Sequence, residues 1–161
     1  MEFIEYIYNL VDPFWATFIA SMIPVGELRI GIPLGVIIYE MNLISAFIAG
    51  FLGNYLIVPL LLYGFQTFYD ITKDFRYMDK FYIFLFKRTR KKTNVIKKRE
   101  FWGLALFVAI PLPMTGAWTG CLAAFLLGIN RERAMISSAI GLFASATLVT
   151  IFSSFFYKLF S

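Results

Sequence analysis

Long apolar runs separated by short polar breaks dominate the pattern along this chain. A helix needs about 20 apolar residues to cross the hydrocarbon core of a bilayer. Four stretches reach that length: Phe14–Tyr39, Leu43–Phe68, Gly103–Ile129 and Ala134–Tyr157. Only the first contains charged side chains, those of Glu27 and Arg29. The pattern predicts an all-α integral membrane protein.

Two of these four stretches, Phe14–Tyr39 and Gly103–Ile129, each contain a pair of prolines. Each proline inside a helix costs about 3 kcal/mol, because it removes a backbone donor and clashes with the preceding turn. Irregular backbone at membrane depth persists only where protein or water satisfies its polar groups. We therefore expect both broken stretches to be re-entrant helical hairpins that turn inside the membrane. The expected tip residues are Pro24, Pro33, Pro111, Pro113, Gly116 and Gly120.

The two broken stretches also resemble each other. Placing Phe14-Trp15 over Phe101-Trp102 puts Ile23-Pro24 over Ile110-Pro111 without a gap. In each half a glycine-rich stretch, a short polar break and a long apolar helix then follow. The shared order predicts a duplication, with one repeat at about 13–68, a polar connector at about 69–100 and a second repeat at about 101–158. Together they form a single membrane domain over residues 1–161.

Basic residues are unevenly placed. Ten of the fifteen lysines and arginines lie in the middle loop, residues 87–99, or at Arg131 and Arg133, whereas acids alone flank the first stretch. If every stretch crossed, the two basic regions would face opposite sides, against the tendency of basic loops to stay cytoplasmic. Opposed re-entrant hairpins remove this conflict and predict inverted repeats in the cell membrane, with residues 69–100 cytoplasmic and the N-terminus outside. Four plain spans are the alternative.

The connector combines an aromatic run, Tyr77–Phe86, with the basic sequence KRTRKKTNVIKKR. The simplest interpretation is a cytoplasmic loop that determines topology. An amphipathic helix that binds anionic membrane lipids is the functional alternative. Nucleic acid is not an expected partner, because the basic run is short and adjoins apolar segments.

Composition disfavours an enzyme. Apolar residues make up 60% of the 161 residues, and the chain has no histidine and a single cysteine, Cys121. It lacks a phosphate-binding glycine loop, a serine nucleophile motif and paired cysteines. We expect no cofactor and no metal, with Cys121 serving to pack the interior.

Glu27 and Arg29 are the strongest candidates for a functional site. A charge at the bilayer centre costs from about 2.5 kcal/mol upward, so an intramembrane ionisable pair indicates a substrate or proton site. Arg29 could hold an anionic head group, and Glu27 could carry a proton. From the facing tip, Thr115, Trp118 and Thr119 complete the expected substrate-binding set. The alternative is a salt bridge that only locks the first tip.

Two stretches, PVGELRIGIPLG and GLALFVAIPLPMTGAWTG, resemble the signatures of the small multi-drug export protein family, a bacterial and archaeal membrane family. Met114 replaces a glycine that is more usual in that family. More distantly, paired re-entrant segments with charged, proline-containing tips are similar to the DedA/SNARE-associated superfamily. That likeness implies translocation of lipids such as polyprenyl phosphates.

Three hypotheses follow. In the first, the chain is a translocase of an anionic amphiphile, with proton coupling through Glu27. In the second, it is an ion-coupled exporter of small cationic molecules. In the third, it is a membrane scaffold without transport. The expected partners are membrane lipids and a small-molecule or lipid substrate. A homodimer that packs through the Gly31/Gly35 and Gly116/Gly120 faces is compatible with so small a chain.

Overall fold

The computed structural model describes residues 11–72, 100–111 and 115–160, and within these ranges every regular element is helical. The all-α expectation is therefore confirmed for the described part of the chain. The elements are α2 (Pro13–Met22), α3 (Leu28–Pro33), the π-helix η1 (Leu34–Ile38), α4 (Leu43–Thr72), α7 (Glu100–Ala109), α8 (Ala117–Leu127) and α9 (Arg131–Phe160).

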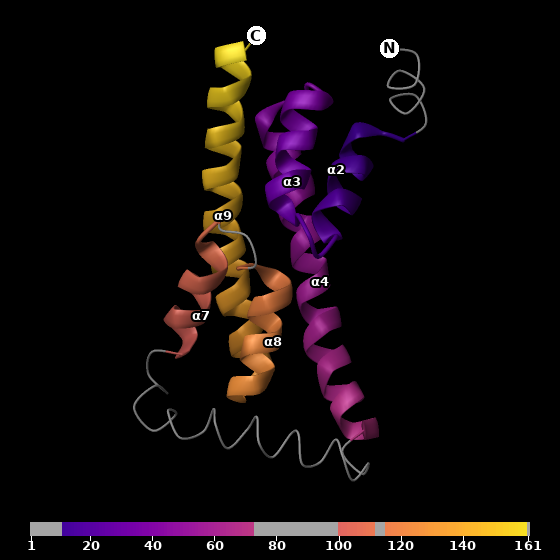
Figure 1. The fold of residues 1–161 in the computed structure, drawn as a ribbon, viewed down its shortest axis with the longest axis vertical. Coiled ribbons are helices and arrows are strands. Elements are labelled where there is room, and N and C mark those ends of the chain that lie inside the picture. The colour runs from indigo at the N-terminus through magenta and orange to yellow at the C-terminus, as the bar shows by residue number, and fades with distance from the viewer. Residues whose placement is uncertain (1–10, 73–99, 112–114, 161) are drawn as a thin grey trace.

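Two long helices, α4 and α9, form the spine of the molecule and run in opposite directions along its long axis (Figure 1). Each has 30 residues and is apolar enough to cross a membrane. Only 33% and 39% of their most apolar windows are buried, whereas the core helix of a soluble protein would be mostly covered. A row of exposed side chains follows α4: Ile44, Ile48, Leu52, Leu56 and Leu60. Such continuous apolar surface is expected of a membrane protein.

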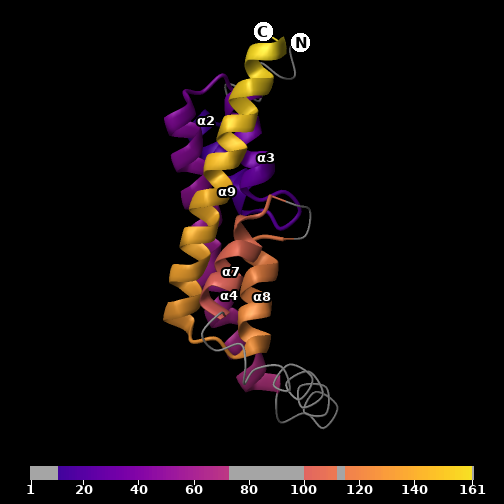
Figure 2. The ribbon, with the colours of Figure 1, turned by 90° about the vertical axis from the view of Figure 1, so that its left-hand side faces the viewer.

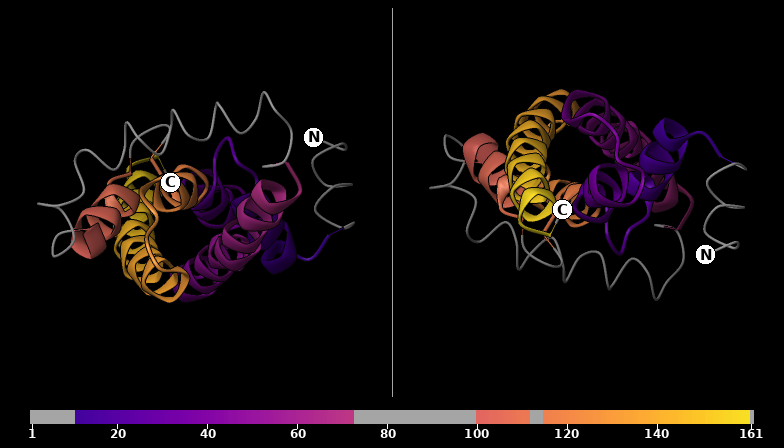
Figure 3. Two further views of the ribbon diagram at one scale, coloured as in Figure 1. Left: turned by 90° about the horizontal axis from the view of Figure 1, so that it is seen from below. Right: turned by 90° about the horizontal axis from the view of Figure 1, so that it is seen from above.

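Shorter helices form two hairpins that lie at opposite ends of this spine (Figures 1 and 2). The first descends as α2, turns at residues 23–27 and returns as α3 and η1 along α4. The second rises as α7 beside α9 and returns as α8, which also contacts α4. Seen along the long axis, α4 and α9 lie next to each other with the hairpin helices around them (Figure 3). The two turns meet near the middle of the molecule.

Both hairpins close through a glycine in the returning helix. A Cβ added at Gly31 would collide with the Ser21 side chain of α2, and one added at Gly120 would lie 2.6 Å from Val108 of α7. The alignment of Phe14 with Phe101 places Ser21 over Val108. In each half, the glycine of the returning helix therefore packs against the equivalent position of the preceding helix.

The long helices approach the hairpins in a matching way. A Cβ at Gly53 of α4 would collide with the backbone carbonyl of Phe18, and one at Gly141 of α9 would lie 2.5 Å from the carbonyl of Ala105. The same alignment places Phe18 over Ala105. Backbone-to-backbone packing of this kind is typical of helices in membranes, where small residues let helix axes come close.

The expected break at Pro33 differs from the structure. Pro33 is the last residue of α3 and continues directly into η1, so it does not lie at the turn. The π-helical pattern of η1, closed by Tyr39 N donating to Leu34 O at 3.0 Å, accompanies the proline-bearing segment without breaking the returning arm. Pro24 does lie in the first turn.

The second turn is described only in part. Pro111 directly follows the end of α7, and Gly116 is the N-cap of α8. Gly120 lies one turn inside α8 and not at the tip. Pro113 and the polar connector, residues 73–99, fall outside the described residues.

The glycine faces expected to support a homodimer are occupied within the chain itself. Gly31, Gly35, Gly116 and Gly120 are all buried, and the first two face the Ser21 and Thr17 side chains of α2. These faces are therefore not free to receive a second copy.

Candidate functional site

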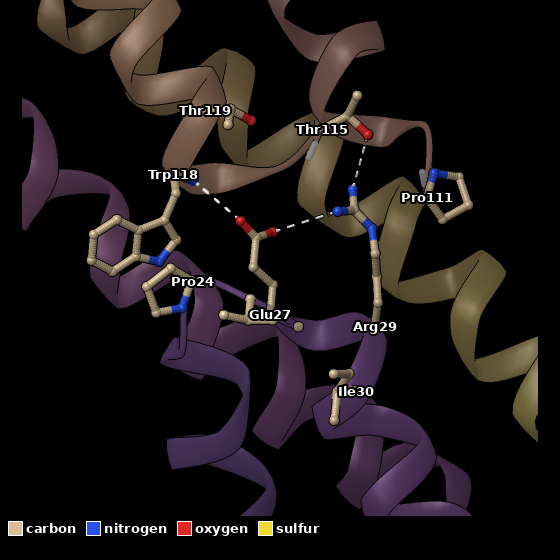
Figure 4. A pocket seen from close by; sticks show the side chains of 10 residues that line it. Pro24, Glu27, Arg29, Ile30, Pro111, Thr115, Trp118 and Thr119 are labelled. Atoms are coloured by element: carbon tan, nitrogen blue, oxygen red, sulfur yellow. Dashed lines mark hydrogen bonds and ion pairs between the residues drawn. The ribbon is translucent and has the colours of Figure 1, made fainter. Parts of the chain in front are cut away.

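Glu27 ends the first turn in a backbone conformation that is unusual for a residue with a side chain. Its φ is 54° and its ψ is −152°, a combination that costs about 1–3 kcal/mol. Its N–H donates to Ile23 O at 3.0 Å, and its carbonyl accepts from Gly31 N at 3.0 Å. These bonds hold the turn, and the carboxylate points across to the second tip (Figure 4).

The Glu27 carboxylate caps the first turn of α8. Oε2 accepts from the backbone N–H of Ala117 at 3.2 Å, and Oε1 accepts from that of Trp118 at 3.3 Å. The first N–H groups of a helix have no partner within it, and an anion at this end is favoured by the helix dipole. A side chain of the first hairpin therefore accepts hydrogen bonds from backbone N–H groups of the second hairpin that have no partner within α8.

Gly116 makes room for this contact. A Cβ at Gly116 would collide with the Glu27 carboxylate, so the close approach depends on the missing side chain. The Gly116 N–H donates instead to Thr119 Oγ1 at 3.1 Å, which satisfies another donor at the start of α8.

Asn54 is a site residue that sequence reasoning missed. It is fully buried in α4, and its Nδ2 donates to Glu27 Oε2 at 3.2 Å. A signal was present, since Asn54 is an amide within an uncharged apolar stretch, where polar side chains usually have a partner or a function. The Glu27 carboxylate of the first tip therefore accepts hydrogen bonds from α4 as well as from the second tip.

Arg29 lies beside this cluster but is bound less fully. Its Nη1 is 3.9 Å from Glu27 Oε2, longer than a hydrogen bond. Its Nη2 donates to Ile110 O at 3.0 Å and faces Thr115 Oγ1 at 3.5 Å, while that hydroxyl donates to Ile110 O at 2.8 Å. Among the described atoms, Arg29 Nε is buried without a hydrogen-bond partner. The described protein atoms thus leave the guanidinium only partly hydrogen-bonded.

A cavity of about 290 Å³ lies between the tips and brings the expected residues together (Figure 4). Its walls come from the first turn, the end of α7 and the start of α8. They include all five expected binding residues and two of the expected tip prolines: Glu27, Arg29, Thr115, Trp118, Thr119, Pro24 and Pro111.

Trp118 also ties the hairpins together. Its indole Nε1 donates to Met22 O, at the end of α2, at 3.2 Å. The ring is therefore held against the first hairpin while it lines the cavity.

Cys121 is fully buried in α8, and its thiol faces Val58 O of α4 at 3.8 Å. Among the described residues, no three histidine, cysteine, aspartate or glutamate side chains cluster as metal ligands would. The polar chemistry of the cavity therefore comes from Glu27, Arg29, the threonines and backbone groups.

Comparison with known proteins gives one match. No curated protein and no solved structure matches the chain, and the more distant resemblance to the DedA/SNARE-associated superfamily gains no support from these comparisons. One family model, described as "Putative small multi-drug export protein", matches residues 27–148. That match begins at Glu27 and includes Arg29, Asn54 and the described part of the second tip. The chain is a membrane protein that belongs to this small multi-drug export protein family.

Proposed function

We propose that the protein is a membrane translocase that moves an anionic amphiphile, such as a polyprenyl-phosphate-type lipid, through the cavity between the two hairpin tips. Arg29 is the head-group anchor in this proposal. The observation that carries it is the Arg29 side chain, 17% exposed, which lines the cavity and approaches Glu27 only to 3.9 Å.

The lengths of the hairpin helices support re-entrant entry into the membrane. α2 and α7 have 10 residues each and α8 has 11, which corresponds to about 15 Å of helix, half of a bilayer core. If α4 and α9 cross the membrane, the two tips lie near its midplane. The site then occupies the depth at which transporters with broken helices bind their substrates.

The matched glycine contacts support an inverted duplication. Gly53 and Gly141 approach equivalent carbonyls, while α4 and α9 run in opposite directions (Figure 1). One hairpin then opens to each side of the membrane, and the basic residue Arg131 lies at the end opposite to Glu40. In this proposal the basic end lies in the cytoplasm, because basic loops tend to stay on that side.

The distribution of hydrogen bonds favours an anionic over a cationic substrate. The Glu27 carboxylate is 5% exposed and already accepts from two backbone N–H groups and from Asn54. A cationic substrate would have to share this crowded carboxylate with Arg29. An anion instead meets the guanidinium directly, and arginine is well suited to hold a phosphate.

In this proposal Glu27 controls the contact between the tips. Protonation would remove the negative charge that holds the start of α8 and would weaken the contact. Such a step would link proton uptake to opening of the cavity. The family description keeps export of small cationic molecules as the second candidate, because it names drug export.

The test is transport in proteoliposomes by wild type and four variants, Arg29→Ala, Arg29→Lys, Glu27→Gln and Arg133→Ala. A fluorescent polyprenyl monophosphate reports lipid movement, and ethidium reports cation efflux. We expect Arg29→Ala to reduce lipid movement by about tenfold or more. Arg29→Lys should retain part of it, since lysine keeps the positive charge but not the planar guanidinium group. The matched control is Arg133→Ala, which removes an exposed arginine distant from the tips.

Each other outcome has a meaning. Ethidium efflux that Glu27→Gln abolishes, without lipid movement, would favour the cation exporter. Movement of neither probe would favour the scaffold. Lipid movement that is equal in wild type and Arg29→Ala would remove Arg29 from the mechanism.

A further inference from the structure

A second cavity, of about 380 Å³, adjoins the site on the other side of Arg29. Arg29 and Pro111 line both cavities, so they form the wall between them. The remaining lining residues are Pro33, Ile37, Val149, Phe152, Ser153 and Phe156.

This second cavity is a groove between the returning arm of the first hairpin and α9, which contact each other. Arg29, Pro33 and Ile37 follow one another at intervals of four residues, which places them on one helical face over about 12 Å. Phe152 and Phe156 do the same on α9. The groove therefore extends from Arg29 near the tips to Phe156, close to the end of α9.

The chemistry of the groove changes along its length. Arg29 lies at its inner end, and every other lining residue is apolar except Ser153. Ser153 Oγ donates to Val149 O of its own helix at 2.8 Å, so its hydroxyl group does not need a hydrogen-bond acceptor from an occupant of the groove. The groove combines a cationic end with an apolar body.

The groove is open on its outer side. Phe152 is 57% exposed, Phe156 49% and Ile37 40%, on a surface that faces lipid if α9 spans the membrane. A chain in the groove could enter sideways from the bilayer without crossing water.

We propose that this groove holds the hydrocarbon chain of the translocated amphiphile while Arg29 holds its anionic head. The inference rests on the proposed function and adds to it a site for the hydrocarbon chain and a route: the amphiphile enters laterally from the leaflet at the C-terminal end of α9. Continuity through Arg29 distinguishes this occupant from an ordinary bilayer lipid, which needs no charge at that position.

Photo-crosslinking locates the occupant directly. The full-length protein is reconstituted in phosphatidylcholine vesicles with a long-chain monophosphate that carries a diazirine in the middle of its chain. We expect adducts within residues 149–156 of α9. The same diazirine chain on phosphatidylcholine should label that segment at least about fivefold less, because choline neutralises its phosphodiester, whereas the monophosphate offers Arg29 more negative charge and more acceptor oxygens.

Two phenylalanines of α9 provide matched variants. Phe152 lines the groove and is 57% exposed, whereas Phe155 is 62% exposed and lies outside it. A chain that leaves lipid for the groove gains packing but little hydrophobic energy, so we expect Phe152→Ala to lower labelling by only about threefold. Phe155→Ala should leave labelling unchanged, and Arg29→Ala should lower it by about fivefold or more.

Failure of the groove and failure of the proposed function are distinguishable. Equal labelling by the two lipids would overturn the groove as a substrate site. The proposed function would still stand if Arg29→Ala abolished lipid movement. Lipid movement that persists in Arg29→Ala would overturn the proposed function and the inference together.

Discussion

The two hairpin tips share a way of packing and differ in chemistry. In both, a glycine of the returning helix rests on equivalent positions of the descending helix, Ser21 and Val108. The first tip carries the charges of Glu27 and Arg29, whereas the described part of the second tip is uncharged and offers backbone N–H groups, a carbonyl and hydroxyls. The two hairpins thus pack in a similar way, whereas their tips are chemically complementary.

This difference explains how a carboxylate can be accommodated in the middle of an apolar protein. Burying an unpaired charge costs several kcal/mol, and a buried charge persists where hydrogen bonds and opposite charge compensate it. Glu27 receives this compensation from α8, α4 and Arg29. Each tip therefore depends on the other, and the comparison can be tested by changing one partner at a time.

The largest expected effect is that of Glu27→Ala. It leaves Arg29 and the start of α8 without their anion, so we expect a loss of about 3–5 kcal/mol in the free energy of unfolding. Thermal unfolding in detergent micelles measures the change. Glu132→Ala, at an exposed position in the first turn of α9, is the control and should cost less than about 1 kcal/mol. Equal losses in the two variants would contradict the role of Glu27.

A smaller effect is expected for Gly116→Ala. The added methyl group collides with the Glu27 carboxylate and forces the tips apart, at a cost of about 1–3 kcal/mol. Gly103→Ala is the matched control, because a Cβ at Gly103 meets nothing within 4 Å and alanine favours a helix. The control should unfold at the same or a higher temperature. The close approach of the tips would be refuted if both variants were equally stable.

The smallest expected effect is that of Trp118→Phe. It keeps an aromatic ring in the cavity wall but removes the indole donor to Met22 O, so we expect a loss of about 0.5–1.5 kcal/mol. Trp102→Phe, at a side chain 64% exposed, serves as the control and should change the unfolding temperature little. A larger loss in the control would argue against the bond between the hairpins.

Much of this arrangement can be predicted from sequence, because lipid imposes simple rules. The lengths of the apolar stretches, the proline at position 24 and the rarity of charge indicate the long helices, the first turn and the importance of Glu27 and Arg29. The residues expected from the second tip, Thr115 and Trp118 among them, do line the same cavity.

Other features leave little trace in sequence. Backbone N–H groups have no residue signature, so the capping of α8 by Glu27 could not be foreseen from residue types. Pro33 reads as a break, yet it lies within a helix that continues into a π-helical turn, because nearby backbone bonds can rearrange around a missing donor. Asn54 was overlooked because a single amide does not interrupt a long apolar run.

The central claim is that the two hairpins enter the membrane from opposite sides and meet within it. Single cysteines introduced by Glu40→Cys and Arg131→Cys, each in a Cys121→Ala background, test it with a membrane-impermeant maleimide on intact cells. Both positions are exposed; Glu40 lies just before α4 and Arg131 begins α9, and these two helix starts lie at opposite ends of the spine (Figure 1). We predict that the cysteine at position 40 is labelled from outside and that the one at position 131 is labelled only after permeabilisation. Labelling of both positions from the same side would contradict the account.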